Sequence, residues 1–256
     1  MNTNSNTYTI VYTTILVVLV AAVLAVAATA LKGRQTDNMN LEKMKTIMLS
    51  TGFGLDEQGA VDKTADFKNL YESHIGNTLV VNCKGETVEA DAFSLNLKAE
   101  YANLKAGAEA SLPVYECTME DGRNVYILAL YGAGLWCAIW GYIALEDDWQ
   151  TVVGAIFDHA SETPGLGAKI AEPAFYTQFA GKVMEKDGAF SPVAVIKGGA
   201  TDRAKDVDAI SGATITSRAV SDMLSVWLAA YLPYIEAQKA MAAVAAEPAE
   251  TAAESV

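Results

Sequence analysis

The hydrophobic pattern of the chain changes after its first segment. Residues Ile10 to Leu31 form an uncharged apolar run, whereas residues 1–9 are largely polar. At about 1.5 Å per residue, a helix of this length crosses a hydrocarbon core of about 30 Å. The run therefore predicts one transmembrane helix. A cleaved signal peptide is the alternative, but it would carry a basic segment before a shorter apolar core, and neither is present.

Two further periodicities follow the span. Apolar residues at helical spacing predict helices over 38–50, 62–74, 170–182 and 216–241. Runs rich in β-branched and aromatic residues, separated by turn residues, predict strands over 78–83, 86–90, 113–119, 124–131, 135–145, 151–159 and 193–197. The segment 93–111 fits either a loop or a helix.

The last predicted helix carries an apolar face at helical spacing, which is typical of a core contact. Pro233 is expected to end or kink this helix. The segment 242–256 is rich in Ala and Glu, which favours a disordered tail. The residues of the predicted core face are Val220, Leu224, Trp227, Leu228 and Tyr231.

Together these patterns predict an α+β protein in which an antiparallel sheet is flanked by helices. The predicted organisation is a short N-terminus (1–9), a transmembrane helix (10–31), a connecting helix and linker (32–60), a globular domain (61–241) and the tail (242–256). The net charge of −13 argues against nucleic acid, because phosphate backbones require clusters of Lys and Arg.

The cysteines and histidines give no metal pattern. Cys83, Cys117 and Cys137 lie far apart without a C-x-x-C pair, and an odd number cannot pair fully within the chain. Each is interpreted as a small hydrophobic residue. His74 and His159 are too few and too scattered for a ligand set, so no metal site is predicted.

Candidate chemistry begins at the turn that precedes the last helix, D-A-I-S-G-A-T-I-T-S from Asp208 to Ser217. Small residues allow a ligand to approach the backbone, and a helix start leaves amide N–H groups without partners. Hydroxyl groups surround this positive helix end, so the turn predicts a phosphate site. A plain capped turn is the alternative, since hydroxyl residues also favour helix N-caps.

The same turn resembles the flavinylation motif D-x-x-S/T-G-A-T-x-x-S/T. In proteins with that motif, the last threonine of G-A-T carries FMN through a phosphodiester bond, and a separate flavin transferase makes the bond from FAD. The resemblance implies that Thr214 is the attachment residue. No side chain nearby in sequence looks like a base that would activate its hydroxyl, which fits an external transferase.

Two more stretches extend the resemblance: G-L-W at residues 134–136 and E-T-P-G-L-G at residues 162–167. The chain is similar to the FMN-binding domains of redox-driven ion pumps, in particular to the C subunits of Na+-translocating NADH:quinone reductases. G subunits of Rnf-type ferredoxin:NAD oxidoreductases share two of the three motifs and are the nearest alternative. A membrane-anchored FMN sensor or regulatory module is an alternative of another class.

The resemblance implies the roles of individual residues, and it implies no catalytic residue. Around the FMN phosphate it places the turn residues and two hydroxyls of the helix, namely Ser211, Gly212, Ala213, Thr216 and Ser217. Around the isoalloxazine it places Leu135, Trp136, Glu162, Thr163 and Leu166, with Lys197 and Gly198 near the flavin or its phosphate. From the residues alone, Trp136 also fits a core position, Glu162 a loop cap and Lys197 a solvated strand end.

The expected setting is an electron-carrying subunit within a complex that oxidises NADH, reduces quinone and pumps Na+. Its partners would be the other subunits, the flavin transferase and membrane lipid. The resemblance implies a single-pass protein of the cell inner membrane with the flavin domain on the periplasmic side. Lys32, Arg34, Lys43 and Lys45 follow the span, and the positive-inside rule would place them in the cytoplasm instead.

Overall fold

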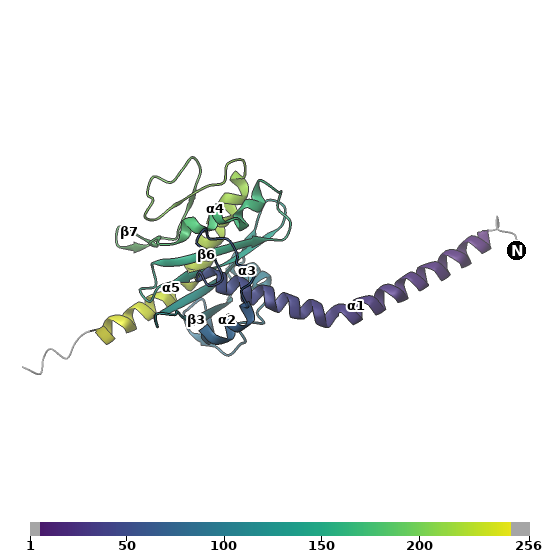
Figure 1. Cartoon of the computed structure of the whole chain (residues 1–256), viewed down its shortest axis with the longest axis horizontal. Helices are drawn as coiled ribbons and strands as arrows, with labels where there is room; N and C mark the ends of the chain where they lie inside the picture. The colour runs from purple at the N-terminus through teal and green to yellow at the C-terminus, as the bar shows by residue number, and fades with distance from the viewer. Residues whose placement is uncertain (1–5, 247–256) are drawn as a thin grey trace, which may run out of the picture. The chain divides into compact units, whose positions relative to one another are not determined.

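The structure is a computed structural model that describes the backbone of residues 6–246 of the 256 residues. It divides into two compact units, of which the first ends at Lys43 and the second begins at Met44. Figure 1 shows the elements along the chain. The predicted domain boundaries stay predictions, although the fully buried Ile47 and Met48 already belong to the core of the second unit.

The first unit contains helix α1 (Asn6–Ser50) as far as Lys43. By length and composition, this helix is suited to crossing a membrane. The sequence predicted two helices joined by a connection, but α1 is continuous. The segment 32–37 contains no proline and only one glycine, Gly33, so it offers the helix no strong break.

The second unit is built around one antiparallel sheet with the strand order β2-β1-β3-β4-β5-β6. This arrangement confirms the predicted α+β class. Consecutive strands from β3 to β6 pair through short connections, and β1 pairs with both β2 and β3. The strands are β1 (Ile75–Asn82), β2 (Thr87–Val88), β3 (Ser111–Thr118), β4 (Asn124–Ala133), β5 (Ala138–Leu145) and β6 (Val152–His159).

Short elements connect the sheet to the last helix. Two small ladders lie outside the main sheet, one antiparallel between β7 and β8 and one parallel between β9 and β10. The remaining elements are α2 (Phe67–His74), α3 (Leu97–Lys105), η1 (Gly167–Ala171), α4 (Pro173–Tyr176), η2 (Thr177–Phe179), β7 (Glu185–Lys186), β8 (Ala189–Phe190), β9 (Val195–Ile196), β10 (Val207–Asp208) and α5 (Thr214–Ala246).

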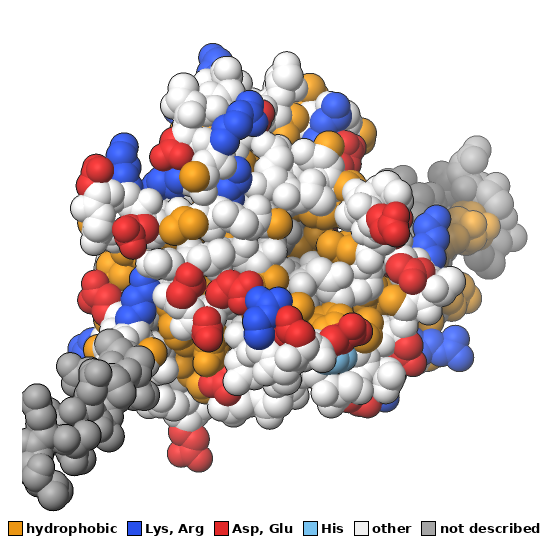
Figure 2. Space-filling view, turned by 60° about the vertical axis from the view of Figure 1, so that its left-hand side comes forward, with side chains coloured by type: hydrophobic (Ala, Val, Ile, Leu, Met, Phe, Trp, Pro, Cys, Tyr) orange, Lys and Arg blue, Asp and Glu red, His pale blue; other side chains and the backbone are white. Residues whose placement is uncertain are grey.

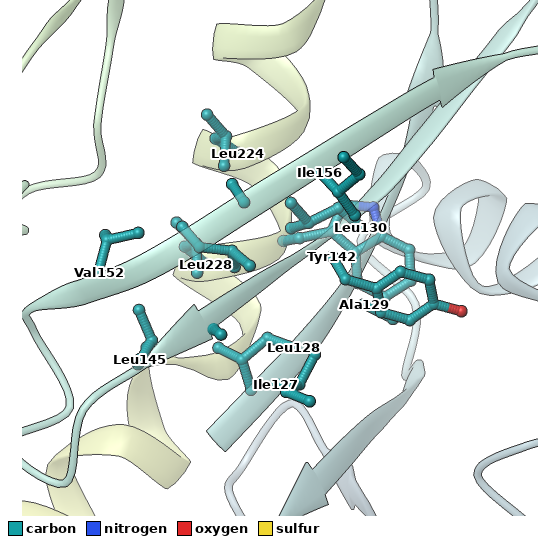
Figure 3. Packing of buried hydrophobic residues seen from close by; sticks show 14 of the residues in the cluster. Ile127, Leu128, Ala129, Leu130, Tyr142, Leu145, Val152, Ile156, Leu224 and Leu228 are labelled. Atoms are coloured by element: carbon teal, nitrogen blue, oxygen red, sulfur yellow. The ribbon is translucent and has the colours of Figure 1, made fainter. Parts of the chain in front are cut away.

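The core lies between α5 and the sheet. Figure 3 shows Leu224 and Leu228 of α5 facing side chains of β4 and β5, among them Leu130 and Leu145. The side chain of Trp227 also anchors the helix, because its indole N–H donates to the carbonyl of Tyr131 at 2.6 Å. All five residues of the predicted core face are fully buried, which confirms that prediction.

Several predicted boundaries were wrong for local reasons. The strand predicted from Leu135 begins at Ala138, because the preceding residues form a loop. The helix predicted from Asp62 begins at Phe67, since the side chain of Asp66 caps it by accepting from the amide of Asn69. The helix predicted over 170–182 is limited to α4 with a 3-10 turn on each side. The undecided segment contains α3.

Helix α5 runs through Pro233 instead of ending there. Proline removes one backbone donor, but Tyr231, Tyr234 and Ile235 around it are buried, and this packing holds the helix in place. The helix reaches Ala246, so the first residues of the predicted disordered tail are helical. The rest of that prediction, 247–256, lies outside the described residues.

Charged side chains cover much of the surface of the second unit. On the face shown in Figure 2, acidic, basic and apolar side chains of the described residues are interspersed.

We expect Leu224→Ala to lower the free energy of unfolding of the second unit by about 2–5 kcal/mol, because it removes a fully buried side chain from the helix–sheet contact. Urea unfolding of the full chain in detergent, followed by tryptophan fluorescence, measures this. Ser225→Ala is the matched control at an exposed neighbour, with an expected change within about 0.5 kcal/mol. Equal effects of the two changes would contradict the described packing.

Candidate functional site

The G-L-W motif forms the loop between β4 and β5. The amide of Gly134 donates to the carbonyl of Cys137 at 2.8 Å, which closes the loop. The side chains of Leu135 and Trp136 point outward and are 43% and 73% exposed. Such exposure is unusual for large apolar residues, so Trp136 is not the core residue that its sequence context also allowed.

The E-T-P-G-L-G motif forms the loop after β6. The amides of Leu166 and Ala168 both donate to the carbonyl of Thr163, which makes the predicted tight turn. Gly165 has a φ of 74°, a conformation that glycine adopts without strain. Thr163 and Leu166 are exposed, and the chain then enters η1. This loop therefore offers a second outward apolar side chain.

Glu162 joins these loops to α5. One carboxylate oxygen, Oε1, accepts from the amide of Trp136 at 3.0 Å, and the other, Oε2, accepts from the hydroxyl of Thr216 at 3.1 Å. The side chain is only 4% exposed. Three motifs that lie far apart in the sequence thus meet at one buried carboxylate.

The charge of this carboxylate is stabilised where it is buried. Burial alone would raise the pKa of Glu162, but hydrogen bonds from the Trp136 amide, the Thr216 hydroxyl and the amides of Leu135 and Cys137 outweigh it. The pKa of Glu162 is therefore lowered from its ordinary value. Successive amides that converge on one anion form a nest, and here the anion belongs to the protein itself.

Two motif glycines are required by this arrangement. A Cβ atom at Gly134 would overlap Oε1 of Glu162, and one at Gly167 would overlap Oε2. The Gly167 Cβ would also lie 2.7 Å from the Thr216 hydroxyl oxygen. Glycine is therefore needed at both positions because a side chain would collide with the carboxylate, and not because the backbone adopts a conformation that only glycine tolerates.

The S-G-A-T turn leads directly into α5, whose first residue is Thr214. Gly212 has a φ of 80°, and the amide of Ala213 donates to the carbonyl of Ile210 at 3.1 Å. Because the helix begins at Thr214, the amides of its first turn have no acceptor within the helix. They add to the positive end of the helix dipole, which is the backbone arrangement on which the predicted anion site depends.

The hydroxyl groups of this turn differ in their availability. Thr216 and Ser217 are each 1% exposed. Thr216 donates to Glu162, and the Ser217 oxygen accepts from the amide of Ile210 at 3.1 Å. Ser211 is exposed and Thr214 is half-buried, so these two hydroxyls remain accessible to a ligand. Gly212 lies against Leu166, because a Cβ there would be 2.9 Å from the leucine Cδ2.

The structure does not bring every predicted residue to this place. Lys197 and Gly198 form an exposed turn after β9, and among the described residues no hydrogen bond or ion pair joins them to 211–217. Asp208, the first residue of the turn motif, holds the neighbouring loop instead. Its Oδ1 accepts from the amide of Ala200 at 2.7 Å, and its pKa is lowered chiefly by that bond.

Two further residues belong to the site that the sequence did not single out. The thiol of Cys137 lies 3.8 Å from Oε1 of Glu162, and its sulfur accepts from the amide of Ser161 at 2.9 Å. Cys137 is thus half-buried and part of the frame, unlike the fully buried Cys117. Ile215, which follows Thr214, is 59% exposed. Its position directly after Thr214, within the attachment motif, was the sequence signal that could have identified it.

Open space adjoins the G-L-W loop. A cleft of about 630 Å³ between α3 and β4 is bordered by Ala133 and Ala138, the residues that flank the loop. A second cleft of about 340 Å³ shares Tyr101 and Ala133 and extends to Ala219 on α5. Both volumes fall in the range of small-molecule sites, which is about 300–1,000 Å³.

Comparison with known proteins identifies the family. The FMN-binding domain profile matches residues 134–229, which include all three motifs. The chain is 30% identical over 258 residues to the C subunit of the Na(+)-translocating NADH-quinone reductase of Haemophilus ducreyi, covering 94% of this chain and 97% of that relative. The chain belongs to the family of these C subunits.

Solved structures of the family agree with the fold. The crystal structure of the C subunit from Parabacteroides distasonis is 37% identical, with a TM-score of 0.70, and the match covers 80% of this chain and 96% of that one. NqrC of Shewanella oneidensis is 22% identical with a TM-score of 0.63, covering 78% and 98%, and shows the shared fold alone.

We expect Gly134→Ala to lower the free energy of unfolding by about 1–3 kcal/mol, because the added methyl group displaces the Glu162 carboxylate from its amides. Gly76→Ala is the control, since a Cβ there meets nothing within 4 Å. Urea unfolding of the full chain in detergent compares the two variants. A Gly134→Ala variant as stable as Gly76→Ala would refute the close contact.

Proposed function

We propose that this chain is the electron-carrying subunit of a membrane-bound Na+-translocating NADH:quinone reductase and that it holds FMN. Family membership and the match to FMN-binding domains support this proposal. The observation that carries it is the meeting of the three motifs at the buried carboxylate of Glu162. When bound, FMN supplies the electron-accepting and electron-donating chemistry that side chains lack.

The attachment point in this proposal is the hydroxyl of Thr214, joined to FMN by a phosphodiester bond. Thr214 combines a half-buried hydroxyl with the unpaired amides of a helix start, which favour a phosphate. Ser211 and the backbone of Gly212 and Ala213 complete the turn. Thr216 and Ser217 support it from inside, because their hydroxyls are engaged with protein groups.

The isoalloxazine would lie against the outward apolar side chains of the two loops, Leu135, Trp136 and Leu166. An aromatic ring system is stabilised by such faces, and Thr163 offers an exposed hydroxyl in the same loop. Lys197 and Gly198 stay candidates for a more distant contact with the flavin or its phosphate.

No residue of this chain is assigned to proton transfer or substrate binding. Its roles are to tether, orient and shield the flavin, while NADH and quinone bind to other subunits. A separate flavin transferase would form the Thr214 bond, since no side chain nearby in the sequence looks like a base for this hydroxyl. Sodium translocation belongs to the assembled complex, because a single apolar helix cannot enclose an ion path alone.

We expect wild-type chain, co-produced with a flavin transferase, to gain the mass of FMN and Thr214→Ala to gain none, because the alanine lacks the bonded oxygen. Intact-protein mass spectrometry measures both. Ser211→Ala is the matched control, since it removes the other accessible hydroxyl and should keep the increment. An FMN increment on Thr214→Ala would show that the flavin is attached elsewhere.

The proposed location is the inner membrane, with α1 as the anchor and the flavin domain on the periplasmic side. We expect alkaline phosphatase fused after Val256 to be active, because this reporter folds only outside the cytoplasm. A cytoplasmic fluorescent reporter at the same position is the reciprocal control and should stay dark. The opposite result would favour the orientation that Lys32 and Arg34 indicate by the positive-inside rule.

A further inference from the structure

The G-L-W loop lies against the buried carboxylate of Glu162, which accepts from the amide of Trp136. We propose that Glu162 is a positioning residue for the flavin, whose ionised carboxylate holds the backbone of residues 134–137 so that Leu135 and Trp136 face outward. This inference rests on the proposed function and deepens it. The residue acts through the loop and does not touch the cofactor.

The first step of the argument is that both carboxylate oxygens are already occupied. Oε1 accepts from the Trp136 amide and lies near the Cys137 thiol, and Oε2 accepts from Thr216. With 4% of its surface exposed, Glu162 has little area left for a ligand. The protein surrounds it from the strand side and from the helix side, so a flavin would meet the loop and not the carboxylate.

The second step concerns how the loop is held. Among the described residues, one backbone–backbone hydrogen bond closes the loop, from the Gly134 amide to the Cys137 carbonyl, and the side chains of Leu135 and Trp136 are exposed. An anion that draws the amides of Leu135, Trp136 and Cys137 inward turns the side chains outward. A neutral group binds such amides more weakly, because charge-assisted hydrogen bonds are about twice as strong as neutral ones.

The third step concerns the charges that face Glu162. Among the described residues, its titratable neighbours are the Cys137 thiol and the His159 ring, whose Nδ1 accepts from the Glu162 amide at 3.2 Å. No basic side chain in the part of the chain that the structure describes forms an ion pair with the carboxylate. The negative charge behind the loop is therefore held by dipoles and is not neutralised, so it adds to the field at a flavin stacked on the loop.

The experiment uses full-length chain co-produced with the transferase and compares wild type, Glu162→Gln and Glu120→Gln. The control removes an exposed carboxylate in the turn between β3 and β4. FMN content is measured by mass spectrometry, the flavin midpoint potential by titration, and the visible circular dichroism of the flavin from neutral to acidic pH. The mass readout separates loss of flavin from loss of its positioning.

We expect Glu162→Gln to carry FMN, to lose most of the visible dichroism and to shift the midpoint potential upward, because a negative charge that opposes electron uptake is gone. The Glu120→Gln control should match wild type. Because the folded pKa of Glu162 is lowered, wild-type dichroism should persist at neutral pH and be lost as the pH falls through that pKa. Glu162→Gln should show no such acid transition.

Thr216→Val provides a second test that keeps the shape of the side chain and removes one donor to Oε2. With one hydrogen bond fewer, the pKa of Glu162 rises, and the acid transition should move to higher pH. Two results would overturn this inference and leave the proposed function standing. One is a Glu162→Gln protein with wild-type dichroism and midpoint potential. The other is a Thr216→Val protein whose acid transition stays at the wild-type pH. A wild-type chain without FMN would overturn the proposed function and this inference together.

Discussion

The arrangement of the site depends on one buried negative charge. A carboxylate removed from water is stable only where donors replace its hydration, and Glu162 finds them on the G-L-W loop and on α5. The requirement works in both directions. The carboxylate stays ionised because the loop surrounds it, and the loop keeps its shape because the charge is there. Gly134 and Gly167 leave the space that the Glu162 carboxylate occupies.

Around this charge the site separates into an inner frame and an outer face. The frame consists of buried polar groups whose hydrogen-bonding capacity is used within the protein. The outer face consists of the large exposed apolar side chains of the two loops, Leu135, Trp136 and Leu166. A soluble surface rarely exposes such a group of residues without a partner to cover it.

Much of the fold was predictable because burial imposes a period on the sequence. Runs of β-branched and aromatic residues identified the strands of the sheet, and the face containing Leu224 and Trp227 identified α5. Helix α3 has no fully buried residue. Its apolar positions Leu97, Tyr101 and Leu104 are only partly buried, so their helical spacing was a weak signal in a segment rich in Ala, Lys and Glu. The passage of α5 through Pro233 depends on packing from distant elements, which no local pattern records.

The candidate site was predictable through its motifs but not through its internal bonds. Short motifs indicated which residues gather, whereas the direction of each hydroxyl depends on the phase of α5. Ser217 lies three residues before Val220 and seven before Leu224, on the core face, and this spacing was the signal that its hydroxyl turns inward. The partner of Glu162 is 54 positions away at Thr216, and no sequence pattern links the two.

The position of Thr214 after the sheet in the sequence also orders the events of synthesis. The ribosome makes the whole sheet before it makes α5, and the frame behind Thr214 requires both. While synthesis is still within the sheet, the chain contains neither the hydroxyl nor the helix end that would receive a phosphate. On the proposed attachment, a chain truncated before Thr214 would therefore offer no acceptor to a modifying enzyme that reads this turn.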